Sequence, residues 1–502
     1  MELHEVKNYF DSLFGKQNRK RFGKLFKTEH KYYFLDTGTG KLAELSQQEY
    51  KMLSLILNNE GFNFSNMNNE DLEILHSLIR YVEEEHILQA IPVTELHSIY
   101  ENDIEHYLNE EVTDLVLEVT EKCNLRCKYC IYNENHPEFR NFSHKDMDIE
   151  IAKKAITFLK EHSGDEVVFL GFYGGEPLMN YRLVKELVSF AKNIMGEKKI
   201  TFSMTTNATL INEEIADFLA SNEFQITISL DGSKEIHNDN RIYKNGSGTF
   251  EDTMRGVVLL SNAYDNFGKD IRILFNSVIT EGDYYDKFDR MNDFFKYDSR
   301  IPKNSVYTSS LADPPPRTLE YILPESIEEI EFQSEIVEPL VDWTVDNFDK
   351  DAFSISSLNS YLSRIHNRFL SEYPVKKYGI NGCCLPGHRK VYVTVDGNFK
   401  PCERIGTCPN IGDVNNGIDI KKIKKIYLDG YSKNYASICN NCWAVNLCGL
   451  CYTDCFDNDC SITQKYRNLD CISQRFTLSK ALANYCRLLE SGNDYIKELK
   501  HD

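Results

Sequence analysis

The chain has 502 residues, and 57 Lys and Arg against 77 Asp and Glu give it a formal net charge of −20. This acidic balance argues against nucleic-acid binding, because phosphates are neutralised by Lys and Arg. The first residues lack the apolar core of a signal peptide, and no stretch approaches the roughly 18 apolar residues of a membrane helix, so we expect a cytoplasmic protein without a membrane partner. The 15 cysteines, an odd number, indicate metal ligands or catalytic thiols rather than a disulfide framework.

The first 100 residues contain no cysteine and predict a small mixed module. Strands are expected at 31–35 and 41–45, on either side of a Gly-containing turn. Ser46 and Glu49 form a capping box that starts a helix, and a second helix is expected over 69–85. This pattern predicts a winged-helix-like domain over 1–100, which is either a binding module or an inert structural cap.

Strand and helix patterns alternate through the middle of the chain, from about residue 112 to 310. Such alternation predicts a parallel sheet with right-handed crossovers, in which ligands bind at the carboxyl ends of the strands. We expect one α/β domain over 101–315. The predicted strands are 115–119, 167–173, 200–204, 225–230 and 271–279, and the predicted helices are 149–162, 184–195, 213–220 and 250–263.

Three cysteines follow the first of these strands with the spacing C-x3-C-x2-C: Cys123, Cys127 and Cys130. Three thiolates suit an iron–sulfur cluster or zinc. A four-iron cluster held by three cysteines leaves one iron open to a small molecule with an amine and a carboxylate. The alternative is a zinc site completed by His136 or His144.

The cysteine motif, with Tyr129, resembles the signature of the radical S-adenosylmethionine (SAM) superfamily. Four further segments resemble motifs of that family in chain order: Phe172–Pro177 its GGEP motif, Asn207 the Asn of its TNG motif (with Ala208 in place of glycine), Ser229–Gly232 its ribose-contacting motif, and His237–Arg241 the segment whose arginine meets the SAM carboxylate. The resemblance implies an α/β fold with a partial (β/α)6 barrel. The SAM contacts it implies are Tyr129, Gly174, Gly175, Glu176, Pro177, Asn207, Ser229, Asp231 and Arg241.

The resemblance also implies the chemistry. A [4Fe–4S] cluster on the three cysteines would bind SAM and pass it one electron, and the resulting deoxyadenosyl radical would remove a hydrogen from an unactivated carbon. The protein would fix the geometry and exclude water. An electron donor such as flavodoxin or ferredoxin is therefore an expected partner.

The last 120 residues are rich in cysteine, and their spacing resembles the SPASM domain of peptide-modifying radical SAM enzymes. Cys384, Gly397 and Cys402 form one grouping, and Cys439 to Cys455 form a second with spacing C-x2-C-x5-C-x2-C-x3-C. The family has three residues where this chain has two between Cys448 and Cys451. We expect an iron–sulfur-rich SPASM domain over 381–502, preceded by acidic bridging helices over 316–380.

By this resemblance the chain would carry two auxiliary [4Fe–4S] clusters, and three in all. A zinc ribbon on part of the second grouping is the alternative, but it leaves the remaining cysteines unexplained. Cys486 lies on an apolar helical pattern and is expected to be a buried core thiol. The first auxiliary cluster would use Cys384, Cys402, Cys408 and either Cys451 or Cys455, with an open iron if Cys408 is not a ligand; the second would use Cys439, Cys442, Cys448 and Cys471, with Cys460 as the rival of Cys471.

The domain predicted over 1–100, which we call the head, resembles the recognition element of maturases that act on ribosomally made peptides. In that element an edge strand pairs with the leader of the precursor. A precursor held by its leader raises the effective concentration of its core at the active site. The combined resemblance predicts a maturase that forms thioether crosslinks from cysteine sulfur to carbon, of the sactipeptide or ranthipeptide type. The alternatives are a carbon–carbon crosslinking maturase, an anaerobic sulfatase-type maturase that forms formylglycine, and a zinc-stabilised peptide-binding protein without catalysis.

Overall fold

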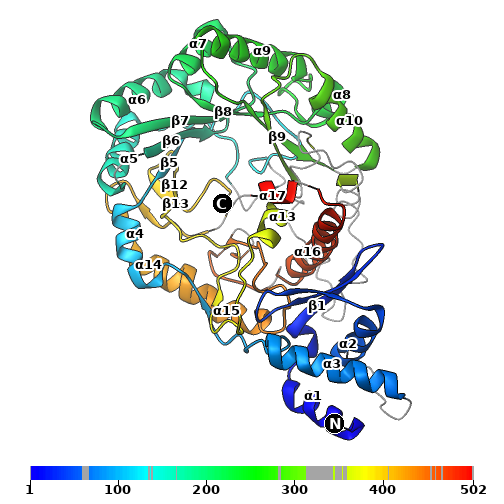
Figure 1. Cartoon of the computed structure of the whole chain (residues 1–502). Helices are drawn as coiled ribbons and strands as arrows, with labels where there is room; N and C mark the ends of the chain where they lie inside the picture. The colour runs from blue at the N-terminus through cyan, green and yellow to red at the C-terminus, as the bar shows by residue number, and fades with distance from the viewer. Residues whose placement is uncertain are drawn as a thin grey trace.

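The structure is a computed structural model with a small head, a curved α/β sheet and a cysteine-rich tail (Figure 1). None of the helices in the described part of the chain is long and apolar enough to cross a membrane. The described residues are 2–58, 67–133, 136, 140–164, 167–280, 284–311, 343–344, 353, 359–404, 406, 408–452, 455–457, 459–464, 467–493 and 495–499.

A ten-stranded sheet runs through the described residues in the order β10-β9-β8-β7-β6-β5-β12-β13-β14-β15. The first six of these strands pair in parallel, which confirms the large parallel sheet predicted from the alternating pattern. The six strands are β5 (Asp114–Thr120), β6 (Val167–Gly174), β7 (Lys199–Thr206), β8 (Gln225–Ser229), β9 (Leu274–Ile279) and β10 (Val306–Leu311).

Helices cover the outer face of this curved sheet, as Figure 1 shows. Their apolar residues recur at helical spacing and meet the buried side chains of the strands in one continuous core. On α6, for example, Leu183, Leu187 and Ala191 are buried at intervals of four residues. The helices are α5 (Ile149–His162), α6 (Tyr181–Ile194), α7 (Glu213–Ser221), α8 (Lys234–Asn240), α9 (Phe250–Asn266) and α10 (Tyr284–Tyr297).

The tail begins as an extension of the same sheet. Strand β12 (Lys390–Val393) pairs in parallel with β5, and β13 (Asn398–Lys400) then turns back against it. Two-residue strands, β14 (Gly412–Asp413) and β15 (Gly417–Ile418), complete the edge. The loops that carry Cys384 and Cys402 are thereby fixed beside the first barrel strand. Helices follow: α14 (Ile420–Lys422), a π-helical segment (Ile423–Asp429), α15 (Gly430–Cys439), α16 (Arg467–Glu490) and α17 (Tyr495–Glu498).

The head contains an antiparallel sheet in the order β1-β2-β3. The strands and the helix predicted at 31–35, 41–45 and 69–85 are present, and the Ser46–Glu49 capping box forms through both of its hydrogen bonds. The first helix and first strand were not predicted. The elements are α1 (Leu3–Phe14), β1 (Gly23–Lys27), β2 (Tyr32–Asp36), β3 (Leu42–Leu45), α2 (Gln47–Asn58) and α3 (Asn69–Glu85).

Buried polar contacts hold the head against the tail. The guanidinium of Arg21 is 2% exposed and donates to the backbone carbonyl oxygens of Asn440 (2.7 Å), Ala90 (2.8 Å) and Ile91 (2.6 Å). Between the head and the barrel the chain forms β4 (Leu96–His97) and α4 (Ile104–Glu110), and β4 pairs in parallel with β11 (Tyr378–Gly379). Because a buried guanidinium is costly without partners, these bonds fix the orientation of the head.

The segment between the barrel and the tail is described only in part. The proline segment Asp313–Arg317 and most of the bridging helices predicted over 316–380 lie outside the described residues. Trp343 is fully buried, and its indole Nε1 donates to Asp289 Oδ1 of α10 at 2.5 Å. Helix α13 (Asn359–His366) then packs on α16, so the described end of the segment contacts the tail.

Candidate functional site

A pocket of about 240 Å³ lies at the carboxyl ends of the barrel strands. The loop after β5 lines it with the three cysteines of the C-x3-C-x2-C motif, and the ends of β6, β7 and β8 supply polar groups. The predicted site residues that line it are Cys123, Cys127, Tyr129, Cys130, Gly174, Gly175, Glu176, Asn207, Ser229 and Arg241, whereas Pro177, Asp231, His136 and His144 are not among its lining residues.

The cysteine loop is fixed by its neighbours on both sides. The backbone N–H groups of Arg126 and Lys128 donate to the carbonyl oxygens of Ile242 (2.7 Å) and Asn240 (3.0 Å). On the other side, Asn207 Nδ2 donates to the side-chain oxygen of Asn124 at 3.0 Å. The spacing of the cysteines, the loop after β7 and the C-terminal end of α8 therefore act together to hold the three thiols in one wall of the pocket.

Burial raises the pKa of the Cys127 thiol to about 12, and it raises the pKa of Cys123 and Cys130 as well. Buried thiols of this kind become thiolates only when a bound metal supplies positive charge. Within the described residues, no three His, Cys, Asp or Glu side chains converge as a single metal ion would require. Three thiols in one wall also suit a four-iron cluster, which takes each thiolate on a different iron.

The two glycines at the end of β6 allow a close approach of the backbone. The amide of Gly175 donates to Thr120 O at 2.9 Å, and that of Glu176 donates to Lys122 O at 2.8 Å. A Cβ on Gly174 or Gly175 would lie 2.2 Å from the Thr120 or Lys122 carbonyl oxygen, respectively. Any side chain here would push β6 away from the cysteine loop, so glycine keeps an open backbone cradle beside the thiols.

Glu176 ties the ends of β6 and β7 together. Its Oε1 accepts from Thr206 Oγ1 (2.7 Å) and its Oε2 accepts from the Asn207 amide (2.8 Å). Burial raises the pKa of this carboxyl to about 7, although both hydrogen bonds oppose the shift. The carboxylate of Glu176, which the resemblance places among the SAM contacts, is thus already oriented at the pocket wall.

Asp231 and Arg241 form a buried ion pair behind the pocket. Arg241 Nε lies 3.1 Å from Asp231 Oδ2, and the hydroxyl of Tyr129 donates to the same oxygen at 2.6 Å. The other Asp231 oxygen accepts from the Val278 amide at 3.0 Å. The resemblance assigns Asp231 to the ribose and Arg241 to the carboxylate of SAM, but the structure pairs them with each other and leaves only Arg241 at the pocket surface.

The loop after β7 contains an unusual backbone conformation. Ala208 stands where the TNG motif has glycine, and its φ of 61° lies in the left-handed region that favours glycine. Its side chain is fully buried. The preceding Asn207 side chain accepts from the Thr209 amide at 3.0 Å, which holds this turn in place.

The first group of tail cysteines gathers from loops that are far apart in sequence. Cys384, Cys402 and Cys451 lie close enough for their charges to interact, and burial raises the pKa of Cys402 to about 12. Cys408 is buried and interacts in the same way with Cys402, Cys451 and Cys455. The structure therefore places the five residues predicted for the first auxiliary cluster within range of one another's charges, and it does not choose between Cys451 and Cys455.

The second group lies around α16. Cys442 packs against an apolar cluster to which α16 contributes, and Cys448 interacts electrostatically with Tyr361, which also bonds to Thr477 of that helix. Cys471 is on the first turns of the same helix. Cys460 instead acts on Lys400, beside Cys408, which favours Cys471 for this group. Cys486 is 1% exposed in the core, as predicted.

The tail also reaches the barrel pocket. Glu403 and Arg404, directly after Cys402, line the pocket together with Tyr132 and Tyr173. Sequence reasoning did not select these four residues. The position of Glu403 and Arg404 beside a predicted ligand was a usable signal. The tyrosines offered a similar one, because Tyr132 follows Cys130 by two residues and Tyr173 directly precedes Gly174.

Residues 117–295 match the sequence profile of the Radical SAM superfamily. This part of the chain is therefore a radical SAM domain, and the family implies SAM and a [4Fe–4S] cluster. The open cradle at Gly174–Gly175 and the three thiols in one wall fit these groups.

Three proteins show the range of the chain's relatives. The uncharacterized protein MJ0907 of Methanocaldococcus jannaschii is 38% identical over 31% of this chain and 50% of its own length. The cysteine-type anaerobic sulfatase-maturating enzyme of Clostridium novyi is 33% identical over 29% of this chain and 40% of its own. The radical SAM cyclopropyl synthase TigE of Paramaledivibacter caminithermalis is 28% identical over 36% of this chain and 38% of its own length. The chain thus spans half or less of the length of these relatives.

Solved structures extend the likeness in fold to most of the chain. Native anSMEcpe with bound AdoMet aligns with a TM-score of 0.54 and 20% identity, over 76% of this chain and 100% of its own. Native anSMEcpe with bound AdoMet and Cp18Cys peptide aligns with a TM-score of 0.53 and 20% identity, over 75% of this chain and 99% of its own. At this identity the likeness shows a shared fold.

Proposed function

We propose that this chain is a radical SAM peptide maturase that forms thioether crosslinks between cysteine sulfur and carbon in a ribosomally made precursor. The observation that carries the proposal is the barrel pocket, in which the three thiols, the glycine cradle and Glu176 share one wall with tail residues next to Cys402. Neighbouring cysteines beyond that wall support an auxiliary cluster within reach of the same reaction.

Each pocket residue has a distinct task in this proposal. Cys123, Cys127 and Cys130 would hold the [4Fe–4S] cluster, whose chemistry with SAM when bound is to generate a radical that takes a hydrogen atom from the peptide. The backbone of Gly174 and Gly175 and the carboxylate of Glu176 would hold the methionine part of SAM. Tyr129, Asp231 and Arg241 fix the wall behind it through their buried contacts.

A thioether crosslink removes two hydrogens from the peptide. One leaves the carbon as a hydrogen atom; the cysteine sulfur loses a proton to solvent, and the remaining electron must leave as the C–S bond forms. The cysteines of the two tail groups would hold auxiliary clusters, and such clusters would supply a place for that electron on its way to an external carrier of the flavodoxin or ferredoxin kind. If Cys408 is not a ligand, Cys384 and Cys402 with Cys451 or Cys455 would hold the first of these clusters through three thiolates, which would leave room for the substrate thiolate.

The head offers a place for the leader. Within the described residues β3 is an edge strand, so its outer backbone groups are available to an added strand. A groove of about 440 Å³ runs beside it, lined by Leu42 and Leu45 of β3 and by Leu78 and Tyr81 of α3. This geometry supports a leader that pairs with β3 and buries apolar side chains in the groove.

A second candidate is a sulfatase-type maturase, which would oxidise one Cys or Ser to formylglycine. The similarity to the Clostridium novyi enzyme and the shared fold with anSMEcpe favour it. The edge strand and groove of the head favour the thioether interpretation, because they provide for recognition of a leader away from the modified residue.

The two candidates separate in one experiment. The chain is co-expressed with short cysteine-containing peptides encoded beside its gene, and the products are examined by tandem mass spectrometry. Thioether formation removes two hydrogens per crosslink and leaves a cysteine that resists alkylation. Formylglycine changes one residue to an aldehyde that reacts with hydrazide and forms no crosslink, and that result would replace the proposal with the second candidate.

A further inference from the structure

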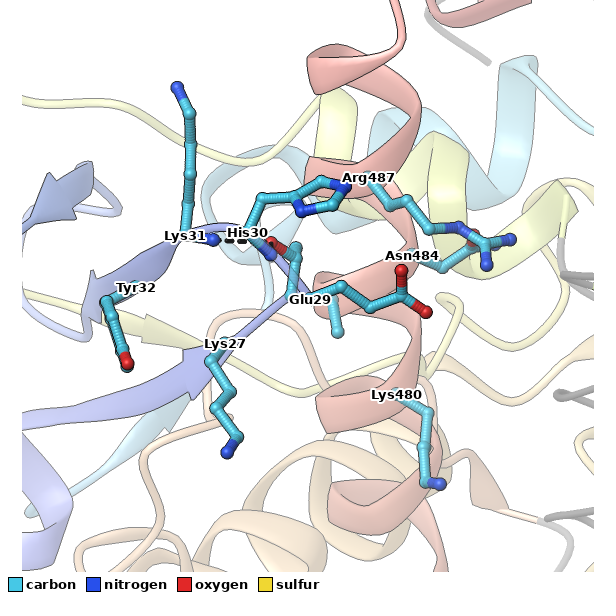
Figure 2. A pocket seen from close by; sticks show the side chains of 10 residues that line it. Lys27, Glu29, His30, Lys31, Tyr32, Lys480, Asn484 and Arg487 are labelled. Atoms are coloured by element: carbon cyan, nitrogen blue, oxygen red, sulfur yellow. Dashed lines mark hydrogen bonds between the residues drawn. The ribbon is translucent and has the colours of Figure 1, made fainter. Parts of the chain in front are cut away.

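A basic cleft lies between the turn that joins β1 to β2 and the C-terminal half of α16 (Figure 2). We call it the hairpin–α16 cleft. Its volume is about 620 Å³. It lies away from the barrel pocket, and none of its lining residues lines that pocket. Its lining residues are Lys27, Thr28, Glu29, His30, Lys31, Tyr32, Lys480, Ala483, Asn484 and Arg487.

The walls of the cleft are held by specific bonds. Thr28 Oγ1 and the Tyr33 hydroxyl both donate to Glu490 Oε1 of α16, at 2.8 and 2.7 Å, which fastens the hairpin to the helix. Thr28 Oγ1 also accepts from the Lys31 amide at 3.0 Å and shapes the turn. Beneath these contacts, Phe26 packs in the same apolar cluster as Leu482. These contacts hold the two walls of the cleft in a fixed arrangement.

The charge of the cleft is opposite to that of the whole chain. Its lining includes four Lys or Arg residues and one His against a single Glu, whereas the chain carries −20. Lys31 is paired with Glu44 at 2.8 Å, so part of this charge is already compensated. Lys480 and Arg487 both belong to α16, as Figure 2 shows, and place two positive charges on the same wall of the cleft. Such a site attracts an acidic ligand.

Asn484 indicates which kind of acidic ligand. It lines the cleft with only 3% of its surface exposed, and among the described residues neither its Nδ2 nor its Oδ1 has a hydrogen-bond partner. Buried side-chain amides without partners are rare. An amide both donates and accepts, which matches a peptide unit with its N–H and C=O, whereas a simple anion only accepts.

We propose that the hairpin–α16 cleft binds an extended peptide segment rich in Asp and Glu. The amide of Asn484 pairs with one peptide unit of the segment, and the basic side chains of Lys27, Lys480 and Arg487 meet its carboxylates. The occupant is an acidic stretch of the precursor; this part rests on the proposed function, while the chemistry of the cleft does not. The cleft is a second contact beside the β3 groove, and it spans the head and the tail.

The test measures peptide binding by the full-length chain, purified anaerobically, without SAM. The probe is a short fluorescent peptide of alternating Glu and Ala, followed by fluorescence anisotropy, with an alternating Lys and Ala peptide as the negative control. The paired change Lys480→Glu and Arg487→Glu is expected to weaken binding about tenfold or more, because both wall charges are reversed. The matched control is Lys424→Glu with Lys425→Glu, two exposed residues of the π-helical segment outside the cleft, which should change the Kd less than about twofold.

A second variant separates a peptide from a simple anion. Asn484→Leu keeps the size of the side chain but removes its capacity to hydrogen-bond a ligand. It should therefore weaken the binding of the Glu–Ala peptide several-fold and leave the binding of tripolyphosphate unchanged. Equal loss for both ligands would overturn the peptide assignment, and an unchanged Kd in the charge-reversal variant would overturn the site. This binding assay contains no SAM and does not depend on catalysis. If the chain modified no peptide in the co-expression experiment, that would refute the proposed function but would leave the binding result standing. Melting curves of every variant verify folding.

Discussion

The barrel pocket and the first tail group gather their cysteines in different ways. In the barrel, Cys123 to Cys130 come from a single loop after one strand, which the neighbouring loops clamp through backbone hydrogen bonds. In the tail, Cys384 and Cys402 flank β12 and β13, which extend the barrel sheet, and Cys451 comes within range of their charges from a loop far along the chain. Local spacing thus defines the first site, whereas the second exists only in the folded chain.

The largest effect is expected from substitutions that remove the cysteines of the barrel site alone. Changing Cys123, Cys127 and Cys130 to Ala should abolish reductive SAM cleavage and lower the iron content by about four per chain, from about 12 for three four-iron clusters. The tail groups should keep their iron, because their ligands belong to other loops. Iron analysis and chromatography of deoxyadenosine measure both effects, and deoxyadenosine formation by the variant would contradict the assignment.

The complementary change breaks the first tail group. Cys402→Ala should remove up to about four irons per chain and stop peptide modification, while SAM cleavage continues, because the barrel cysteines are untouched. Cys486→Ala is the matched control, since this thiol is buried in the apolar core of α16. Equal loss of iron in both variants would show that the protein had merely unfolded. Cys451→Ala and Cys455→Ala, compared in the same way, identify the fourth ligand.

A smaller effect comes from His237, which supports the wall behind the barrel pocket. Its Nδ1 accepts from the Asp231 amide (3.4 Å) and its Nε2 lies 3.0 Å from Thr249 Oγ1, whose hydroxyl donates to the Arg241 carbonyl at 2.9 Å. Burial lowers the pKa of this imidazole to about 3, so it stays neutral in the folded state. Below a pH of about 6.5 the unfolded chain takes up the proton, and the free energy of unfolding should fall by up to about 1.4 kcal/mol per pH unit until about pH 3.

Denaturant unfolding of the wild type and of His237→Asn between pH 5 and about 7.5 measures this slope. The Asn side chain keeps an acceptor for the Asp231 amide but does not titrate, so the variant should lose less stability in acid. Glu176, whose pKa is raised to about 7, contributes in the opposite direction, with stability lost as the pH rises through that value. The difference in slope between the wild type and His237→Asn gives the contribution of the histidine to the pH dependence of stability. Parallel slopes would contradict the claim that His237 causes the loss of stability in acid.

The smallest effect concerns Ala208. Relief of the left-handed strain in Ala208→Gly is offset by the lost methyl burial and the greater freedom of unfolded glycine, so the free energy of unfolding should change by less than about 1 kcal/mol. Ala208→Val should lower it by about 2 kcal/mol or more, because a β-branched residue fits neither this φ nor the full burial. Equal stability of the two variants would contradict this account of the turn.

The sequence predicted the barrel well because its elements are long and periodic. The helices at 149–162 and 213–220 and the strand at 167–173 agree with the structure to within one residue. The motif residues also fall at strand ends, as expected for a parallel sheet. In contrast, β1 and α1 were missed, since β1 (GKLFK) carries little β-branched or alternating signal and is stabilised by pairing with β2 and packing on α16.

The contacts of individual site residues were harder to predict. The pairing of Asp231 with Arg241 and Tyr129 depends on three loops that meet only in the closed sheet. The same holds for Glu403 and Arg404, which come from the tail to the barrel pocket. Spacing within one loop is visible in a sequence, whereas contact between distant loops requires the fold.

The most direct test of the central claim is electron paramagnetic resonance of the reduced, reconstituted protein with and without SAM. If the barrel cysteines hold a cluster with an open iron, SAM should change the signal of one cluster in the wild type. The Cys123/Cys127/Cys130→Ala variant, which keeps only the tail clusters, should give a spectrum that SAM does not alter. A wild-type spectrum that is the same with and without SAM would contradict the assignment of the barrel pocket.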